Sequence, residues 1–166
     1  MDLNVVFFFQ VGFTMLLMAL ATRWWLMPRL RAMPVHDALS IVLFGGAVRY
    51  MGTILLVPSM APGIPADLVG AGGDVLCAVI ATAAILANRA ASPAGKPLAW
   101  AYVVFGGLDL VVTFLKGLQS GMWTHLAAGW TFVVAIFPAI VIALVLTVVL
   151  LVRPHAAPAR AVATSG

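Results

Sequence analysis

Three ionisable side chains lie inside stretches of this sequence that are otherwise almost entirely apolar: Arg49, Asp74 and Asp109. A guanidinium group can bind a carboxylate through two parallel N–H···O hydrogen bonds, so Arg49 and an aspartate are natural partners. Because two aspartates face one arginine, one carboxylate is left to accept a proton, a cation or a basic group of a ligand. The chemistry that these residue types can do is therefore ion binding and proton transfer.

The composition indicates that these residues belong to a membrane protein. Of the 166 residues, 64% are hydrophobic and 8% are charged, whereas soluble proteins average about 45–50% apolar and about 25% charged residues. So few charges cannot cover a soluble domain, and so many apolar residues exclude a disordered chain. The nine basic residues are dispersed and mostly flank apolar runs, so the net charge of +4 does not indicate nucleic-acid binding.

The fold class predicted from the apolar runs is an all-α bundle of five transmembrane helices. An apolar helix of about 20 residues can cross the hydrocarbon core of a bilayer. The connectors between the runs are rich in proline, glycine and basic residues. We expect one transmembrane domain over residues 1–152 and a flexible cytoplasmic tail over residues 153–166. The predicted spans are residues 4–26, 38–59, 69–88, 98–118 and 126–152.

The distribution of basic residues predicts an orientation. The first and third connectors and the C-terminal segment are basic, whereas the second connector carries only Asp67 and the fourth side only Lys116. Basic loops remain on the cytoplasmic side, so we expect the N-terminus outside and the C-terminus inside, in the inner membrane of a cell. The first run begins Met-Asp-Leu-Asn rather than with basic residues, which favours a retained helix over a cleaved signal peptide. Four tryptophans near the predicted membrane edges are expected as interfacial anchors: Trp24, Trp25, Trp100 and Trp123.

The depths of the charged residues bring Arg49 and Asp109 to one level. At a rise of about 1.5 Å per residue, Arg49 and Asp109 each lie roughly 15 Å below the outer ends of their spans. Asp74 lies about 8 Å below the outer end of its span. We therefore expect Arg49 and Asp109 to pair near the middle of the membrane, with Asp74 approaching the same guanidinium from the outer side.

Further polar and aromatic side chains in the outer halves of the spans predict an outward-facing cavity above this pair. Arg49 would hold an anionic group or a carboxylate, and the two aspartates would accept donors or protons. The aromatic and imidazole side chains would line or gate the mouth. The predicted ligand-binding residues are Arg49, Asp74, Asp109, Tyr50, His125, Trp130, Thr53, Lys116 and Gln10.

The sequence leaves three functional hypotheses. The first is an integral membrane protein that binds a small amphipathic or charged molecule or protons. This hypothesis extends to translocation of what is bound. The second is a non-catalytic accessory or scaffold subunit of a larger membrane complex, or a homo-oligomer, in which the Arg/Asp network only fixes helix packing. The third is a membrane-embedded enzyme. No Gly-x-Ser-x-Gly elbow or other nucleophile–base pair is visible, so no catalytic residue is assigned.

No cofactor is expected. His36 and His155 fall on the predicted inner side and His125 on the outer side, so no pair can hold one haem iron. The single Cys77 provides neither a disulfide nor a zinc framework, and no metal-binding cluster of carboxylates or histidines is visible. The expected partners are the lipid bilayer and a small-molecule ligand, and no nucleic acid.

Short motifs along the chain resemble a family of proteins. These are Arg49-Tyr50-Met51-Gly52 through Val57-Pro58, then Gly73-Asp74, Gly107-Leu108-Asp109 and Ala128-Gly129-Trp130. Over about residues 40–145 the chain resembles an uncharacterised family of small bacterial multi-pass integral membrane proteins with about five helices. The resemblance implies the fold and the choice of charged residues, and it implies no activity. The last span departs from the resemblance, because the family implies more polar character there.

Overall fold

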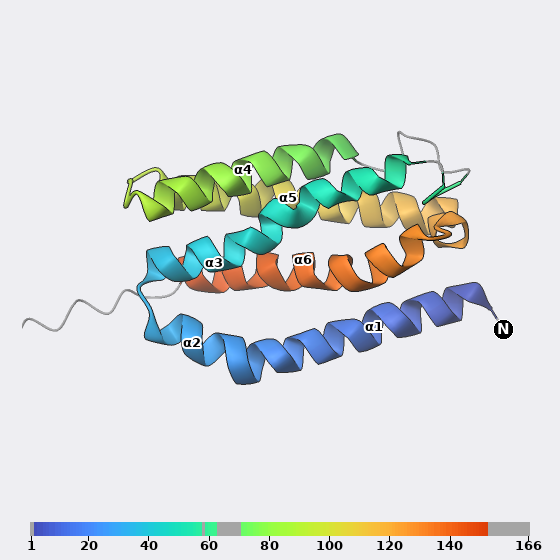
Figure 1. Ribbon diagram of the computed structural model, residues 1–166, viewed down its shortest axis with the longest axis horizontal. Coiled ribbons are helices and arrows are strands. Elements are labelled where there is room, and N and C mark those ends of the chain that lie inside the picture. Colours follow the sequence, from blue (N-terminus) through green and yellow to red (C-terminus); the bar gives the residue numbers. More distant parts are fainter. Residues whose placement is uncertain (1, 58, 63–70, 153–166) are drawn as a thin grey trace, which may run out of the picture.

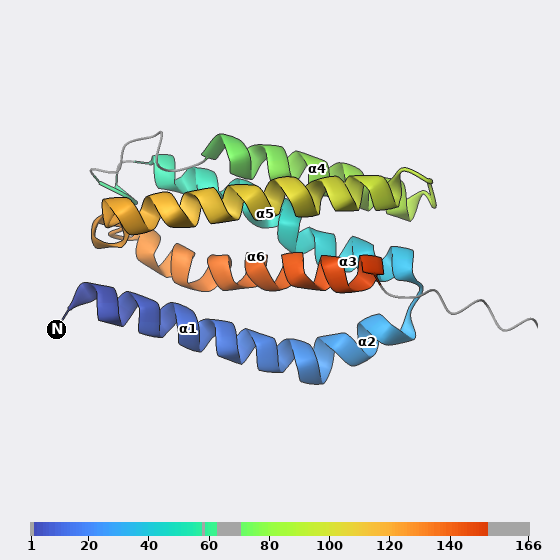
Figure 2. The ribbon, with the colours of Figure 1, turned by 180° about the vertical axis from the view of Figure 1, so that it is seen from behind.

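The described part of the chain is built from helices that run side by side (Figures 1 and 2). A computed structural model describes residues 2–57, 59–62 and 71–152. Within these ranges, five helical segments are long and apolar enough to cross a membrane, so the predicted all-α architecture with five spans is confirmed. The segments are Leu3–Ala32, Val35–Leu56, Gly72–Arg89, Gly95–Ser120 and Gly129–Val152. The predicted tail over residues 153–166, and Asp67 of the second connector, lie outside the described residues.

The first span is longer than predicted, and its helix bends along its length. It consists of α1 (Leu3–Ala21), a π-helical segment η1 (Thr22–Leu26) and α2 (Met27–Ala32). The sequence predicts a connector from residue 27, and this is wrong for residues 27–32, because Pro28 occupies the first turn of α2, where a missing N–H is tolerated. The helix ends at Met33, which is extended (φ −109°, ψ 163°) because Pro34 follows it.

The second span changes its helix type near its middle. It begins as α3 (Val35–Ala47) and continues as the 3₁₀ helix η2 (Val48–Leu56), which carries Arg49. A 3₁₀ helix has 3.0 residues per turn instead of 3.6, so the side chains of η2 point in directions that an α-helical count does not give. This change of rotation matters for the residues that surround Arg49.

The last three spans are regular helices of different lengths. They are α4 (Ala71–Arg89), α5 (Gly95–Ser120) and α6 (Gly129–Val152), with the short 3₁₀ helix η3 (Met122–His125) between α5 and α6. Helix α5 ends at Gly121, whose φ of 61° is left-handed, a conformation that glycine adopts without steric cost. This turn brings η3 back over the end of the bundle.

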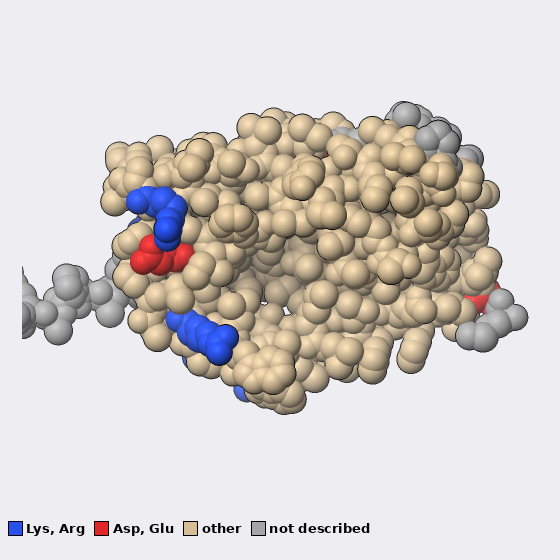
Figure 3. All heavy atoms as spheres, viewed as in Figure 1, with Lys and Arg blue, Asp and Glu red and all other residues tan. Residues whose placement is uncertain are grey.

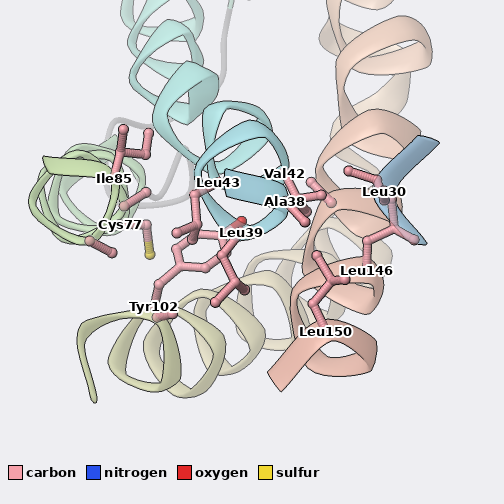
Figure 4. Close-up of a cluster of buried hydrophobic side chains, with 14 residues drawn as sticks. Leu30, Ala38, Leu39, Val42, Leu43, Cys77, Ile85, Tyr102, Leu146 and Leu150 are labelled. Atoms are coloured by element: carbon pink, nitrogen blue, oxygen red, sulfur yellow. The ribbon is translucent and has the colours of Figure 1, made fainter. Parts of the chain in front are cut away.

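The core of the bundle lies where α3 packs between α4, α5 and α6 (Figure 4). Leu39 and Leu43 of α3 lie beside Tyr102 of α5, and Leu146 and Leu150 of α6 close the other side. The first span is peripheral. In its most apolar stretch only 6% of the residues are buried, and α1 packs mainly against α6 (Figures 1 and 2).

Two adjacent glycines let α3 approach both of its neighbours closely. A Cβ atom added at Gly46 would lie 2.5–2.7 Å from the ring and hydroxyl of Tyr102. One added at Gly45 would lie 2.6 Å from the Cβ atom of Ala143 in α6. Membrane helices pack through such small residues because no hydrophobic driving force operates between apolar helices in lipid.

We predict that Gly46→Ala destabilises the bundle by about 1–3 kcal/mol, the usual cost of overpacking a core. Gly12→Ala in α1 is the matched control, because an added Cβ there meets no atom within 4 Å. Thermal unfolding of the detergent-solubilised proteins, followed by circular dichroism, measures the difference. Equal melting temperatures for the two variants would contradict the packing described here.

Candidate binding site around Arg49

The guanidinium of Arg49 is buried and hydrogen-bonded through all three of its nitrogen atoms. Nε donates to Oδ1 of Asp74 at 3.0 Å, and Nη2 donates to Oδ2 of Asp109 at 2.5 Å. Nη2 also lies 2.9 Å from Oδ1 of Asp74, and Nη1 donates to the carbonyl oxygen of Gly106 at 2.9 Å. The residue as a whole is only 2% exposed. The predicted contacts of Arg49 with Asp109 and Asp74 are thus confirmed, and they join η2, α4 and α5.

The carbonyl of Gly106 is a partner that the sequence analysis misses. It is accessible because glycine has no side chain to cover it; a Cβ atom there would lie 3.2 Å from Nη1 of Arg49. The signal in the sequence is a glycine three residues before Asp109, which places it on the same helical face.

Two further glycines make room for the carboxylates. A Cβ atom added at Gly52 of η2 would overlap Oδ2 of Asp74, and one added at Gly73 of α4 would overlap Oδ1 of Asp109. Each carboxylate therefore lies directly against the backbone of a neighbouring helical segment. The cluster is as dependent on these glycines as on its charged side chains.

The charges of the cluster do not balance. Among the described residues, the ion pairs of Asp74 and Asp109 are both with Arg49. The side chain of Arg49 is 3% exposed, whereas those of Asp74 and Asp109 are 19% and 21% exposed. With both carboxylates ionised, the cluster carries one net negative charge and keeps acceptor capacity on the accessible parts of its carboxylates.

A cavity of about 100 Å³ adjoins the cluster. Arg49, Gly52 and Asp74 form its polar end, and Asp109 does not line it. Apart from Thr113, the remaining wall is apolar and includes four aromatic side chains from α5, η3 and α6: Phe114, Trp123, Phe132 and Phe137. A group that enters this cavity meets a carboxylate and a guanidinium at one end and aromatic rings elsewhere.

The aromatic wall is itself packed into the fold. Trp123 is 6% exposed and stacks on Phe7 of α1, with ring centroids 5.0 Å apart. Phe114 stacks on Phe137 with centroids 6.1 Å apart. The sequence predicts an interfacial position for Trp123 and does not single out the phenylalanines, because aromatic residues in an apolar run carry no sign of which face they occupy.

The structure does not bring the other predicted site residues to this cavity. Tyr50 is 58% exposed, and its carbonyl accepts a hydrogen bond of 2.8 Å from Oγ1 of Thr53. Lys116 and His125 are exposed, and among the described residues Lys116 makes no ion pair with Asp109. Tyr50 directly follows Arg49 in η2, so it points to a different side of the helix. The 3₁₀ geometry accounts for Thr53, because four residues of a 3₁₀ helix turn Thr53 about 120° away from Arg49, whereas an α-helix would keep it within about 40°.

The last two predicted site residues bind each other. Nε1 of Trp130 donates to Oε1 of Gln10 at 2.6 Å, which joins α6 to α1 beside the stacked pair of Phe7 and Trp123. Their observed role is to attach the first span to the bundle. Within the described residues, no group of three histidine, cysteine or acidic side chains could hold a metal ion.

Fold and site together define a polytopic α-helical membrane protein with a buried Arg–Asp cluster beside an aromatic cavity. Residues 6–152 match the family described as Domain of unknown function (DUF8737), and the chain belongs to this family. No curated protein and no solved structure matches the chain. The resemblance to a bacterial family of small multi-pass proteins stays a prediction, because the family description states neither a source nor a membrane.

We predict that Arg49→Gln lowers the free energy of unfolding by about 3 kcal/mol, because it leaves two half-buried carboxylates without their cation. Arg89→Gln is the control: its side chain is 67% exposed and 3.8 Å from Asp37, a contact worth at most about 1 kcal/mol. Chemical unfolding in mixed micelles measures both. The triple variant with Asp74→Asn and Asp109→Asn should recover part of the loss. An Arg49→Gln protein as stable as Arg89→Gln would refute a structural role for the cluster.

Proposed function

We propose that this membrane protein binds a small amphipathic molecule in the cavity beside Arg49, and that the molecule carries a positively charged group. The observation that supports this most strongly is a guanidinium shared by two carboxylates, one of which, Asp74, lies at the polar end of an aromatic cavity. The function concluded from the site is therefore ligand binding within the membrane.

The sign of the ligand's charge follows from the hydrogen bonds of the cluster. An anion in the cavity would have to compete for Arg49, whose three nitrogen atoms are already engaged. A cation would instead meet Asp74, which lines the cavity and keeps part of its carboxylate accessible. Binding a cation would also neutralise the remaining negative charge, and a neutral cluster costs less to bury than a charged one.

The apolar part of the ligand is matched by the aromatic wall. The faces of Trp123 and the phenylalanines attract a cation electrostatically and exclude water, which strengthens the interaction with Asp74. Cavities for small molecules commonly combine a mostly apolar lining with a few convergent polar groups. A primary or quaternary amine with a compact hydrocarbon body meets both requirements.

Translocation is the second form of this proposal, and one feature of α6 favours it. Pro138 lies inside α6, next to Phe137 of the cavity wall, and removes a backbone hydrogen bond from the helix. A helix weakened at this point bends more easily, and bending would change the access to the cavity. This change in access would let the ligand, or protons taken up by Asp74 or Asp109, pass through the cavity.

We further propose that the protein lies in the inner membrane of a bacterial cell with its N-terminus outside. The support is the excess of basic residues at the helix ends that flank the first and third connections: Arg23, Arg29 and Arg31 in the first case, and Arg89 and Lys96 in the second. In this orientation η3 and the Arg49 cavity lie toward the outer side. An accessory or scaffold role in a larger complex or a homo-oligomer remains the alternative proposal, supported by the exposed apolar surface of the first span.

We predict that the cavity distinguishes ligands by charge. Benzylammonium, benzyl alcohol and benzoate have similar sizes and different charges, and equilibrium dialysis against the protein in lipid nanodiscs, with empty nanodiscs subtracted, compares them. Benzylammonium should bind at least tenfold more tightly than the other two, because only a cation can pair with Asp74. Asp74→Asn should abolish this preference for the cation. Phe137→Leu should weaken the binding of all three probes without changing the preference.

The matched control is Lys116→Gln, which changes a charged residue of the outer half that does not line the cavity. It should bind benzylammonium like the unaltered protein. If the three probes bind equally, or if Asp74→Asn keeps the preference for the cation, the proposed site is wrong. If a second protein chain co-purifies in a fixed ratio and no probe binds, the accessory role replaces the proposed ligand-binding function.

We predict opposite labelling of two connectors. In a background with Cys77→Ala, single cysteines are placed by Ala94→Cys, between α4 and α5, and by Ala128→Cys, just before α6. Both positions are exposed. A membrane-impermeant maleimide added to intact spheroplasts should label the cysteine at position 128, and the one at position 94 only after lysis. The reverse pattern would invert the orientation.

A further inference from the structure

The bend in the first span opens a groove at the end of the molecule opposite η3. The groove has a volume of about 740 Å³ and lies between the α1–η1–α2 segment and α6. Its floor is apolar and is formed by Met15 and Ala19 of α1 with Val141 and Val145 of α6. It does not touch the Arg49 cavity, so what it binds is a separate question.

Cationic side chains stand at the mouth of this groove. Arg23 and Arg31 line it together with Trp24, and all three side chains are exposed. Among the described residues that line the groove, none is acidic. On the face drawn in Figure 3, basic side chains lie at the end where α2 lies, with an acidic side chain between them, while the middle of that face is uncharged. The groove therefore combines an apolar floor with a positively charged rim.

The length of α1 places this rim at the level of lipid headgroups. Helix α1 has 19 residues, which at about 1.5 Å each nearly spans a hydrocarbon core of about 30 Å. Arg23 and Trp24 follow directly in η1, at the height where arginine and tryptophan side chains meet phosphates and water. Met15 and Ala19 lie one to two turns deeper, at the height of acyl chains.

We propose that the groove binds one anionic phospholipid, with its phosphate between the guanidinium groups of Arg23 and Arg31 and one acyl chain along the apolar floor. Guanidinium groups bind phosphate oxygens bidentately, and the absence of acidic lining residues offers nothing to the ammonium group of a zwitterionic lipid. A transmembrane helix of another protein fits less well, because two arginines would have to be covered by an apolar surface.

A neighbouring groove on the other side of the first span provides the matched control. It has a volume of about 440 Å³, and of the described residues that line it Arg29 is the one basic residue and lies together with Trp25. Arg29 belongs to the same helical end and carries the same charge. Arg29→Gln therefore changes the general attraction of this end to anionic membranes as much as Arg23→Gln does, without altering the proposed site.

The test is lipid retention by the full chain. The protein is reconstituted in vesicles of equal parts phosphatidylglycerol and phosphatidylcholine, extracted gently and examined by native mass spectrometry. We expect one phosphatidylglycerol per chain, at least fivefold less in Arg23→Gln and an unchanged amount in Arg29→Gln. Ala19→Phe, which fills the floor without changing charge, should also lose the lipid and covers the case in which Arg23→Gln misfolds.

Brominated lipids provide an independent readout. Quenching of tryptophan fluorescence by brominated phosphatidylglycerol should exceed quenching by brominated phosphatidylcholine, and this excess should disappear in Trp24→Phe. Equal retention of both lipids, or equal losses in Arg23→Gln and Arg29→Gln, would overturn the proposal in favour of non-specific attraction. A retained protein chain in place of the lipid would also overturn it.

Discussion

A guanidinium group in the middle of an apolar bundle sets the arrangement of three helical segments. An arginine at the centre of a membrane helix costs about 2.5–3.5 kcal/mol on the insertion scale, so its position is stable only where other groups compensate the charge. In this protein Arg49 meets carboxylates from α4 and α5 and a carbonyl of α5. These bonds have defined lengths, so they fix how far η2 lies from both helices.

The glycines of the structure follow from this constraint. Gly52, Gly73 and Gly106 lie where the carboxylates and the guanidinium come closest to a neighbouring backbone, and a methyl group at the first two would occupy the space of a carboxylate oxygen. Gly45 and Gly46 have the same role one to two turns away, where α3 meets α6 and α5. The ionic contacts and the close helix packing therefore depend on each other. If the helices lay farther apart, the ion pairs of Arg49 would break and the packing at the glycines would be lost.

The number of helices and the pairing of the charges are predictable from the sequence, whereas the faces of the helices are not. Run length and depth are one-dimensional properties, and they suffice to place Arg49, Asp74 and Asp109 at similar heights. Rotation is normally inferred from the contrast between apolar and polar faces. In a membrane both the lipid-facing and the buried face are apolar, so Tyr50 and Trp123 give no indication of their directions. The sequence also carries no signal for the switch to 3₁₀ geometry in η2, and it does not show that Pro28 falls in the first turn of a helix rather than in a connector.

The peripheral first span connects the two ends of the molecule. Near its start, Phe7 stacks on Trp123 and Gln10 accepts a hydrogen bond from Trp130. Near its end, Leu30 is buried in the main core. Between these attachments the groove separates the bend from α6. Because Trp123 also forms part of the wall of the Arg49 cavity, any displacement of α1 shifts a ring against which a ligand would rest. A lipid that fills the groove would oppose such displacement, and the composition of the membrane at one end would then bear on the shape of the cavity at the other.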